Sequence, residues 1–521
     1  MMMIYNLYKK HKFEWLLLQN TLFFVLAAFL LPIRFQDNDD SLMCLIASGN
    51  YSGSPDAHLV FINYIYGLIL KLFYVFVPGI EWYTLFFCLM HIVSLSVITY
   101  KIITNNNERI IRFMFVFLFY VIETVIIQSF QFTTTAAILA LAGFLLIFDQ
   151  KKWVAVFGVL FILLGSLIRF EAVMLITIIA LPMYIKKLIN IRSLLLFVIC
   201  LAAVVAFNLI DREIYNQDRN WRSYIEYNEL RGKINDNPNA ISLRDNFSMN
   251  EININDYKLL LKYFPDGNIL NSHSLKQINE KLGLAQFDEK ILNSKQILSY
   301  LPFIVIILSL FLITGFSQTT TLNRFIVTAG AILFLSIIVG ISMNASLKFR
   351  VFITAILPLF FLLQYYFISQ RPHIRKLFVL TLSLFIMSLL YVVVTKKINK
   401  NSEINKVYSM QLPLLERNKG VNVVPFADHF RIENTNPFKL HSLQNSLVFG
   451  GWLTNIPFNA QKFDSFKSFV DRKLLLFVSR KKSDQFIQMI QTSIDNNYGI
   501  KTSVSVIDMN DEYLLILFRR I

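Results

Sequence analysis

Three carboxylates stand within four residues, at Asp37, Asp39 and Asp40, directly after the first apolar stretch of the chain. Like charges this close repel one another, which raises the proton affinity of at least one of them. A carboxylate tuned in this way beside a bilayer is suited to act as a general base on a substrate that arrives in lipid. The same pattern also fits an acidic loop that only keeps a juxtamembrane turn in water.

A second charged group, Arg169-Phe170-Glu171, interrupts an otherwise apolar run from 153 to 185. A charge near the middle of a bilayer costs roughly 2.5–3.5 kcal/mol on insertion scales. The run is therefore better divided into two short helices that turn at Arg169. A guanidinium can bind a phosphate through two parallel hydrogen bonds, and the neighbouring Glu171 would orient it. An interfacial turn with a local ion pair is the alternative.

Further charged residues lie at the edges of apolar stretches. Lys348 and Arg350 form a short turn that indicates either an anionic ligand, such as a lipid phosphate, or ordinary headgroup contact. Arg34 either pairs with Asp37 or flanks the substrate. His58 is a candidate to assist the carboxylates or to bind a metal, although a single histidine near an interface is more often only a polar tip.

The composition is that of a polytopic membrane protein. Of the 521 residues, 55% are hydrophobic and only 16% are charged, whereas soluble domains carry about 25% charged residues. The net charge of +16 does not indicate nucleic acid, because most Lys and Arg residues lie in short clusters between apolar runs, as topology signals do. The 3 cysteines are scattered and form no metal-site or disulfide pattern.

Eleven stretches are candidate spans, since a span needs about 20 apolar residues. They are 15–32, 82–103, 111–127, 130–148, 153–168, 172–185, 193–210, 297–316, 325–343, 351–368 and 377–394. A further apolar stretch, 58–77, is ambiguous because it contains Asn63, Gly67 and Lys71. If 58–77 does not cross, the later basic clusters all lie in the cytoplasm; if it crosses, they all lie outside, against the positive-inside bias. We therefore predict that 58–77 is an interfacial helix.

This topology has about eleven spans, with the N-terminus in the cytoplasm and the C-terminus outside. Residues 1–395 would form the membrane domain, with 34–81 as a long first external loop. The polar insert 211–297 is rich in Asn, Asp and Lys, and we expect short amphipathic helices that fold over the membrane face.

The tail, 396–521, has the pattern of a small extracytoplasmic α/β domain. Residues 474–478 are a short apolar strand, and Ser483 begins a helix with one apolar face. Residues 503–507 and 513–518 flank a turn sequence, which predicts a hairpin.

The start of the chain has a recognisable order. Asp39-Asp40-Ser41-Leu42-Met43 is followed by Ala47-Ser48-Gly49-Asn50-Tyr51 and then by an apolar run from 58 to 76 that ends at Pro78. This order resembles the opening of the GT-C glycosyltransferases, particularly the protein mannosyltransferase and aminoarabinose transferase group. The resemblance covers residues 34–103 in motif and the remainder only in architecture. The group's Lys-Pro-Pro run has no counterpart here, so the subfamily and the sugar are not defined.

The resemblance implies roles for the acidic residues. Asp39 matches the catalytic acid of the group's acidic pair, and Asp40 matches its neighbour. Some members use a divalent cation at this loop, and an all-oxygen site from Asp37, Asp39 and Asp40 would suit Mg²⁺ or Mn²⁺. The donor implied is a polyprenyl-phosphate-linked sugar.

The sequence therefore predicts a mainly α-helical, GT-C-like membrane enzyme, in a bacterial inner membrane by the same resemblance. It would transfer a sugar to a hydroxyl of a glycan, lipid or protein on the outer face, with Asp39 as general base and inversion at the sugar carbon. The leaving phosphate would be stabilised by Arg169, with Lys348 and Arg350 as second candidates. The alternatives are an O-antigen polymerase or ligase, a lipid-linked-sugar transporter, and a non-enzymatic envelope assembly protein.

Overall fold

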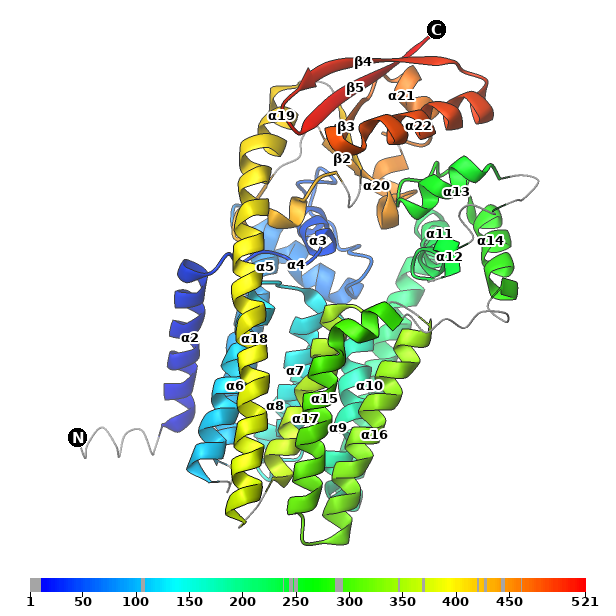
Figure 1. Ribbon diagram of the computed structural model, residues 1–521. Helices are drawn as coiled ribbons and strands as arrows, with labels where there is room; N and C mark the ends of the chain where they lie inside the picture. Colours follow the sequence, from blue (N-terminus) through cyan, green and yellow to red (C-terminus); the bar gives the residue numbers. More distant parts are fainter. Residues whose placement is uncertain are drawn as a thin grey trace.

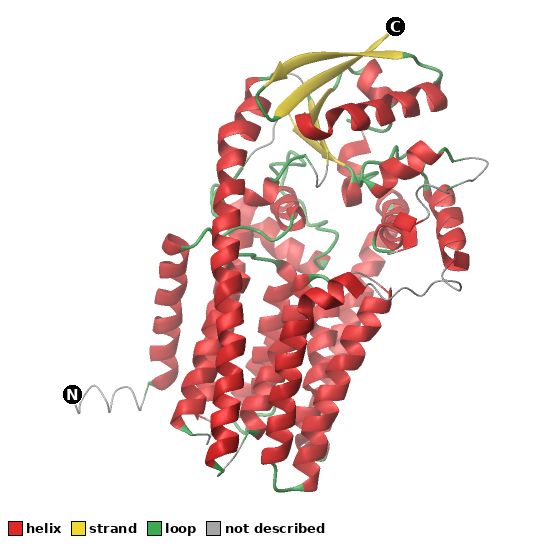
Figure 2. Ribbon diagram, in the orientation of Figure 1, coloured by secondary structure: helices red, strands yellow, loops and turns green. Residues whose placement is uncertain are grey.

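The computed structural model describes residues 11–104, 108–237, 239–242, 247, 252–285, 294–344, 347–367, 371–418, 421–425, 429–441, 446–460 and 462–521. Ile368, the predicted end of one span, and parts of the predicted insert lie outside these residues. The chain is mostly helical, with a bundle of apolar helices at one end and a small sheet at the other (Figure 1, Figure 2).

Each predicted span corresponds to a helix of the bundle. These helices are α2 (Lys12–Leu30), α5 (Trp82–Thr104), α6 (Arg109–Ile127), α7 (Phe132–Ile147), α8 (Lys152–Ile168), α9 (Phe170–Leu188), α10 (Ile191–Gln217), α15 (Ser294–Ser317), α16 (Thr321–Asn344), α17 (Phe349–Tyr366) and α18 (Pro372–Lys406). Within the described residues, 8 helices are long and apolar enough to cross a membrane: α2, α5, α6, α10, α15, α16, α17 and α18. The helices α7 and α8 are apolar but shorter. The chain is thus a multi-pass membrane protein.

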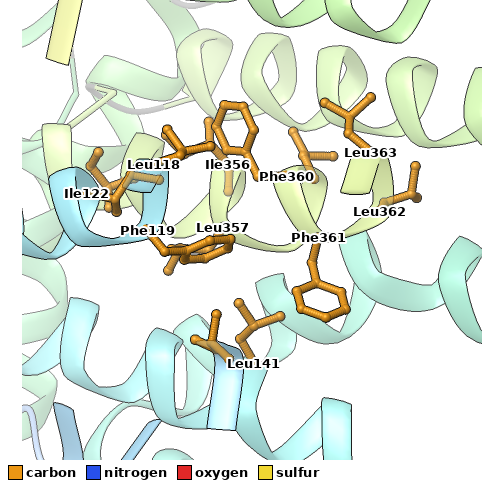
Figure 3. Packing of buried hydrophobic residues seen from close by; sticks show 14 of the residues in the cluster. Leu118, Phe119, Ile122, Leu141, Ile356, Leu357, Phe360, Phe361, Leu362 and Leu363 are labelled. Atoms are coloured by element: carbon orange, nitrogen blue, oxygen red, sulfur yellow. The ribbon is translucent and has the colours of Figure 1, made fainter. Parts of the chain in front are cut away.

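Helix α17 lies at the centre of the bundle. Its side chains Ile356, Leu357 and Phe360 are buried, and they pack with Leu118 and Phe119 of α6 in one continuous apolar core (Figure 3). The outer helices instead expose large apolar side chains, as a lipid-facing surface requires.

The helices α7 and α8 approach closely through two glycines. A Cβ atom built at Gly158 would lie 2.5 Å from the backbone nitrogen of Ile147, and one at Gly143 would lie 2.7 Å from the carbonyl oxygen of Gly158. Small residues of this kind let membrane helices approach backbone to backbone. The contact matters for the candidate site because both helices have one end there.

Replacing Gly158 with leucine should therefore destabilise the bundle. Overpacking typically costs about 1–3 kcal/mol, so the midpoint of thermal unfolding in detergent should fall. Gly315→Leu is the matched control, because a Cβ atom at Gly315 meets nothing within 4 Å. Equal unfolding midpoints for the two variants would contradict the close-packing account.

The first loop contains two helices, α3 (Asn38–Ser48) and α4 (Tyr64–Phe76). The 13 residues of α4 give a length of about 20 Å at 1.5 Å per residue. That is too short to cross a hydrocarbon core of about 30 Å. The helix α3 was not predicted from the sequence, and it carries the acidic residues.

The insert forms the predicted short helices, which follow the C-terminal end of α10. They are α11 (Arg219–Asn235), α12 (Asn239–Ser242), α13 (Ile254–Leu261) and α14 (Ser272–Ala285). Their apolar faces form a core of their own around Tyr257 and Ile278. They lie on the same side of the bundle as α3 and the sheet (Figure 1).

The tail is joined to the bundle by α18, η1 (Val407–Gln411) and α19 (Leu412–Arg417). Its strands are β1 (Asn422–Pro425), β2 (Ser446–Phe449), β3 (Leu475–Ser479), β4 (Thr502–Met509) and β5 (Tyr513–Arg520), in the order β2-β1-β3-β5-β4. β1 is parallel to β2 and β3, and β5 is antiparallel to β3 and β4.

The remaining elements of the tail are short helices and one longer helix: η2 (Ile432–Asn434), η3 (Gly451–Leu453), α20 (Pro457–Ala460), α21 (Lys467–Asp471), η4 (Arg480–Lys482) and α22 (Ser483–Tyr498). The strand, helix and hairpin predicted for the tail are confirmed as β3, α22 and β4–β5.

Hydrogen bonds join the tail to the insert. The Asp256 carboxylate accepts from the Ser493 hydroxyl at 2.6 Å, and Asn255 donates to the carbonyl oxygen of Met489 at 2.6 Å. These contacts fix the two soluble parts against each other on the side where α3 lies.

Candidate functional site

Helix α3 separates the three carboxylates that are adjacent in sequence. Asp37 is the N-cap, and Asp39 and Asp40 lie in the first turn, where the helix dipole favours negative charge. Successive residues of an α-helix point about 100° apart. Asp39 therefore faces a cavity, while Asp40 points into the protein.

The cavity has a volume of about 550 Å³ and lies between the bundle, the insert and the tail. It is lined by Asp37, Asn38, Asp39, Phe61, Phe132, Arg169, Asn228, Glu229, Arg231, Gly232, Asn235, Asp236, Tyr263, Lys348, Arg350 and Trp452. Five of the predicted site residues line it together: Asp37, Asp39, Arg169, Lys348 and Arg350. They come from three separate parts of the chain: the start of α3, the break between α8 and α9, and the start of α17.

Asp39 is held by the tail. The indole nitrogen of Trp452 donates to one oxygen of the Asp39 carboxylate at 2.8 Å. Burial raises the pKa of Asp39 above its usual value, and repulsion from Asp37 raises it further. Arg350 and the Trp452 hydrogen bond act in the opposite direction but do not cancel the rise. Asp39 is thus a stronger base than an exposed aspartate.

Trp452 is itself fixed in position by the insert. Tyr224 donates its hydroxyl to the carbonyl oxygen of Trp452 at 2.7 Å, and the Gly451 nitrogen donates to the carbonyl oxygen of Tyr263 at 2.7 Å. Gly450 has a φ of 105°, and a Cβ atom there would overlap the same Tyr263 oxygen. Only glycine fits at this close approach.

Asp37 forms an ion pair with Arg350 and accepts a hydrogen bond from the Gln131 amide at 3.1 Å. This pair joins α3 to the start of α17 across the cavity. The ion pair that the sequence offered as one possibility, between Arg34 and Asp37, is replaced by this one.

Asp40 does not line the cavity. It is 0% exposed, and one carboxylate oxygen accepts from the Tyr83 hydroxyl at 2.8 Å and from the Phe132 backbone nitrogen at 3.0 Å. Burial raises the pKa of Asp40 well above its usual value. These bonds hold α3 against the first residue of α7, which makes Asp40 a positioning residue.

Arg169 stands at the break between α8 and α9, where its backbone is extended. Its Nε forms an ion pair with Glu171 at 2.9 Å, and its guanidinium lies 5.4 Å from the centre of the Phe132 ring. Lys348 lies 3.4 Å from Asp236. Glu171 borders a neighbouring cleft and not the cavity, and its side chain is 67% exposed.

That neighbouring cleft has a volume of about 780 Å³ and runs along α9, α16 and α17. Its walls are mostly apolar and include Leu175, Ile178 and Ile341. Five residues line both the cavity and the cleft: Phe132, Arg169, Asp236, Lys348 and Arg350. The polar cavity and the apolar cleft therefore meet at three cationic side chains.

The other two predicted site residues lie elsewhere. Arg34 donates from Nε to the carbonyl oxygen of Asn434 at 2.9 Å, and burial lowers the pKa of Arg34. His58 stacks on Trp221 with ring centres 4.4 Å apart and lies 2.7 Å from the Asp56 carboxylate. Both residues join the first loop to distant segments rather than lining the cavity.

The cavity wall also contains residues that were not predicted from the sequence: Arg231, Trp452, Phe61 and Phe132. Arg231 is 8% exposed, and its guanidinium donates to the side-chain oxygens of Asn228 and Asn235 at 2.8 and 2.9 Å. Among the described residues, Arg231 forms no ion pair with a carboxylate. Its guanidinium adds a positive charge to the wall of the cavity.

The three acidic residues do not form a metal site. Asp37 faces Arg350, Asp39 faces Trp452, and Asp40 is turned into the protein. Among the described residues, no group of three His, Cys, Asp or Glu side chains is close enough together to hold a metal ion. The arrangement does not fit the Mg²⁺ or Mn²⁺ ligand set considered from the sequence.

Comparisons of the chain with protein-family models, with curated proteins and with solved structures found no match.

Proposed function

We propose that the protein is an integral-membrane glycosyltransferase of GT-C type that uses a polyprenyl-phosphate sugar as donor. One observation carries the proposal: Asp39, with its raised pKa, shares a cavity with Arg169, Arg231 and Lys348, and that cavity adjoins an apolar cleft in the bundle. Transfer from a lipid-linked phosphate donor needs a base for the acceptor hydroxyl, cations for the leaving phosphate and an apolar surface for the lipid chain.

In the proposed reaction, Asp39 takes the proton of an acceptor hydroxyl. The oxygen then attacks the anomeric carbon from the face opposite the phosphate. The new carbon–oxygen bond forms as the bond between that carbon and the phosphate oxygen breaks, with inversion. The leaving polyprenyl phosphate keeps the electron pair, and Arg169 and Lys348 stabilise its charge.

The apolar cleft is suited to the polyprenyl chain. Leu175 and Ile178 of α9 and Ile341 of α16 line it, and Arg169 stands where it meets the cavity. A chain in this cleft would bring its phosphate to Arg169 and Lys348. The insert and the tail close the cavity from the other side, so the acceptor would approach through them.

The proposed topology has eleven spans in a bacterial inner membrane, with the cavity outside. It is supported by the basic residues Lys151, Lys187 and Arg375, which stand at helix ends away from the sheet. Two reporters can be fused after Ile521, one that is active only outside the cytoplasm and one that is active only inside it. We expect activity from the first reporter alone. Activity of a cytoplasmic reporter at that position would reject the topology.

The pH dependence of transfer should reveal Asp39 as the base. A general base works only when deprotonated, so a raised pKa moves the acid limb of kcat/KM to higher pH. Trp452→Phe removes a hydrogen bond that lowers the pKa of Asp39, and the limb should move further up. Asp37→Asn removes repulsion and leaves Arg350 unpaired, so the limb should move down.

The measurement is a pH profile of kcat/KM for the three proteins. Shifts of opposite sign distinguish this account from general damage to the site, which would lower the rate at every pH. Identical acid limbs in wild type and both variants would contradict the assignment of the base.

An O-antigen polymerase or ligase is the second candidate, because three arginines, Arg169, Arg231 and Arg350, line the cavity. Proteoliposomes supplied with a labelled polyprenyl-phosphate monosaccharide and, separately, with a polyprenyl-diphosphate oligosaccharide distinguish the two. We expect consumption of the first and release of polyprenyl phosphate. Consumption of the diphosphate substrate alone would reject the proposal in favour of the second candidate.

A further inference from the structure

A second large cavity lies at the opposite end of the bundle from the candidate site. It has a volume of about 500 Å³ and is lined by the last turns of α5, α7, α9 and α17. The helices α7, α9 and α17 each begin at the candidate site, at Phe132, Arg169 and Arg350, so their other ends are far from it. The two cavities share no lining residue.

The second cavity is strongly basic. Four lysines line it against one carboxylate, Asp149: Lys101, Lys151, Lys186 and Lys187. Lys101 pairs with Asp149 at 2.9 Å, so that carboxylate is already neutralised. Lys186 donates to the side-chain oxygen of Asn323 at 2.7 Å and keeps its charge. Three positive charges therefore remain in excess around the cavity.

Two buried hydroxyl groups in its wall have no hydrogen-bond partner. They belong to Tyr184 and Tyr366, and the absence holds for the described residues. Tyr366 is only 3% exposed, and Lys186 lies 5.8 Å from the centre of its ring. A buried hydroxyl that makes no hydrogen bond has lost its water without compensation. Two such donors beside an excess of lysines are suited to an acceptor-rich anion.

The remaining wall of the cavity is apolar. Phe148 packs against Tyr184 with ring centres 4.9 Å apart, and Phe144, Met183 and Phe361 continue the wall. A free inorganic anion would gain nothing from an apolar surface. A lipid would bind to both kinds of wall, because its headgroup phosphate contacts the basic wall and its acyl chain contacts the apolar wall.

We propose that this cavity binds the phosphate headgroup of an anionic phospholipid from the leaflet at that end of the bundle. The lysines bind the phosphate through their positive charge, as basic side chains near a membrane surface do. The hydroxyls of Tyr184 and Tyr366 donate to its oxygens, and the apolar wall holds the upper part of an acyl chain. The site is independent of the sugar-transfer reaction proposed above.

Native mass spectrometry of the full chain tests the proposal. The protein is incorporated into phosphatidylcholine nanodiscs with or without phosphatidylglycerol, and the lipid that stays bound after release is counted. Wild type should retain phosphatidylglycerol and not phosphatidylcholine. The double variant Lys151→Gln/Lys187→Gln should retain several-fold less. Lys152→Gln, a neighbouring exposed lysine that does not line the cavity, should behave as wild type.

Tyr366→Phe keeps the ring and removes only the hydroxyl, so it should weaken retention without the loss of a charge. Equal retention of phosphatidylglycerol by wild type and the double variant would overturn the proposal. Complete displacement of the lipid by inorganic phosphate would also overturn it, since the site would then be one for a free anion. Size-exclusion profiles of all variants show whether each is folded.

Discussion

Asp39→Asn is expected to lower kcat for sugar transfer about 10²–10⁴-fold, the usual contribution of a general base. Asparagine has nearly the same shape, and its side-chain oxygen can still accept the hydrogen bond that Trp452 donates to Asp39 at 2.8 Å. The position of η3 against α3 should therefore survive. What is lost is the ability to take a proton from the acceptor.

The matched control is Glu229→Gln, which neutralises another carboxylate of the same cavity wall. It should retain most of the activity, because Glu229 has no place in the proposed proton transfer. Donor binding by the Asp39 variant, measured as retention of a labelled polyprenyl-phosphate sugar without acceptor, should be close to that of wild type. Wild-type turnover by purified Asp39→Asn would reject Asp39 as the base.

The apolar helices could be predicted because their signal is local. A run of about 20 apolar residues between basic clusters needs no knowledge of its neighbours. The same holds for β3, α22 and the hairpin β4–β5, whose short-range patterns matched the structure. The helix α3 was missed because its sequence begins with charged residues, and its burial depends on α5 and the tail packing around it.

The residue types alone do not separate the roles of the neighbouring acids. Asp39 and Asp40 look equivalent in a linear motif, and only the resemblance to a known family predicted Asp39 as the catalytic acid and Asp40 as its neighbour. A helix turns successive side chains about 100° apart. Asp39 consequently reaches the cavity, while Asp40 accepts bonds from Tyr83 and the Phe132 backbone. The three-dimensional direction of α3 supplies the physical reason why the two side chains differ.

Long-range partners of the site had no signal at all in the sequence. Trp452 is 413 residues away from the carboxylate to which it donates. Arg231 belongs to a polar insert whose composition gives no hint of which side faces inward, although its partners Asn228 and Asn235 lie only three and four residues away on the same helix. By contrast, Arg169, Lys348 and Arg350 could be singled out from the sequence, because a charge beside an apolar run is costly, and the structure brings the three to one cavity.

Arg169→Ala is expected to lower kcat about 10²–10³-fold, as the removal of one fixed donor from a developing anion does. Arg169 lines both the cavity and the apolar cleft, so the leaving phosphate would meet it where the lipid chain emerges. Arg169→Lys should recover part of the loss, because it keeps the charge but not the paired donors of a guanidinium. The measurement is single-turnover release of polyprenyl phosphate at saturating donor.

Glu171→Gln is the control for this prediction, since it removes the ion-pair partner at 2.9 Å and leaves the guanidinium in place. The Glu171 side chain is 67% exposed, and exposed ion pairs contribute at most about 1 kcal/mol, so only a small effect is expected. Comparison with Asp39→Ala in the same assay then separates the two candidate functions. A glycosyltransferase with a general base requires large losses in both variants. A large loss in Arg169→Ala with near-normal transfer by Asp39→Ala would instead favour the arginine-dependent polymerase or ligase chemistry.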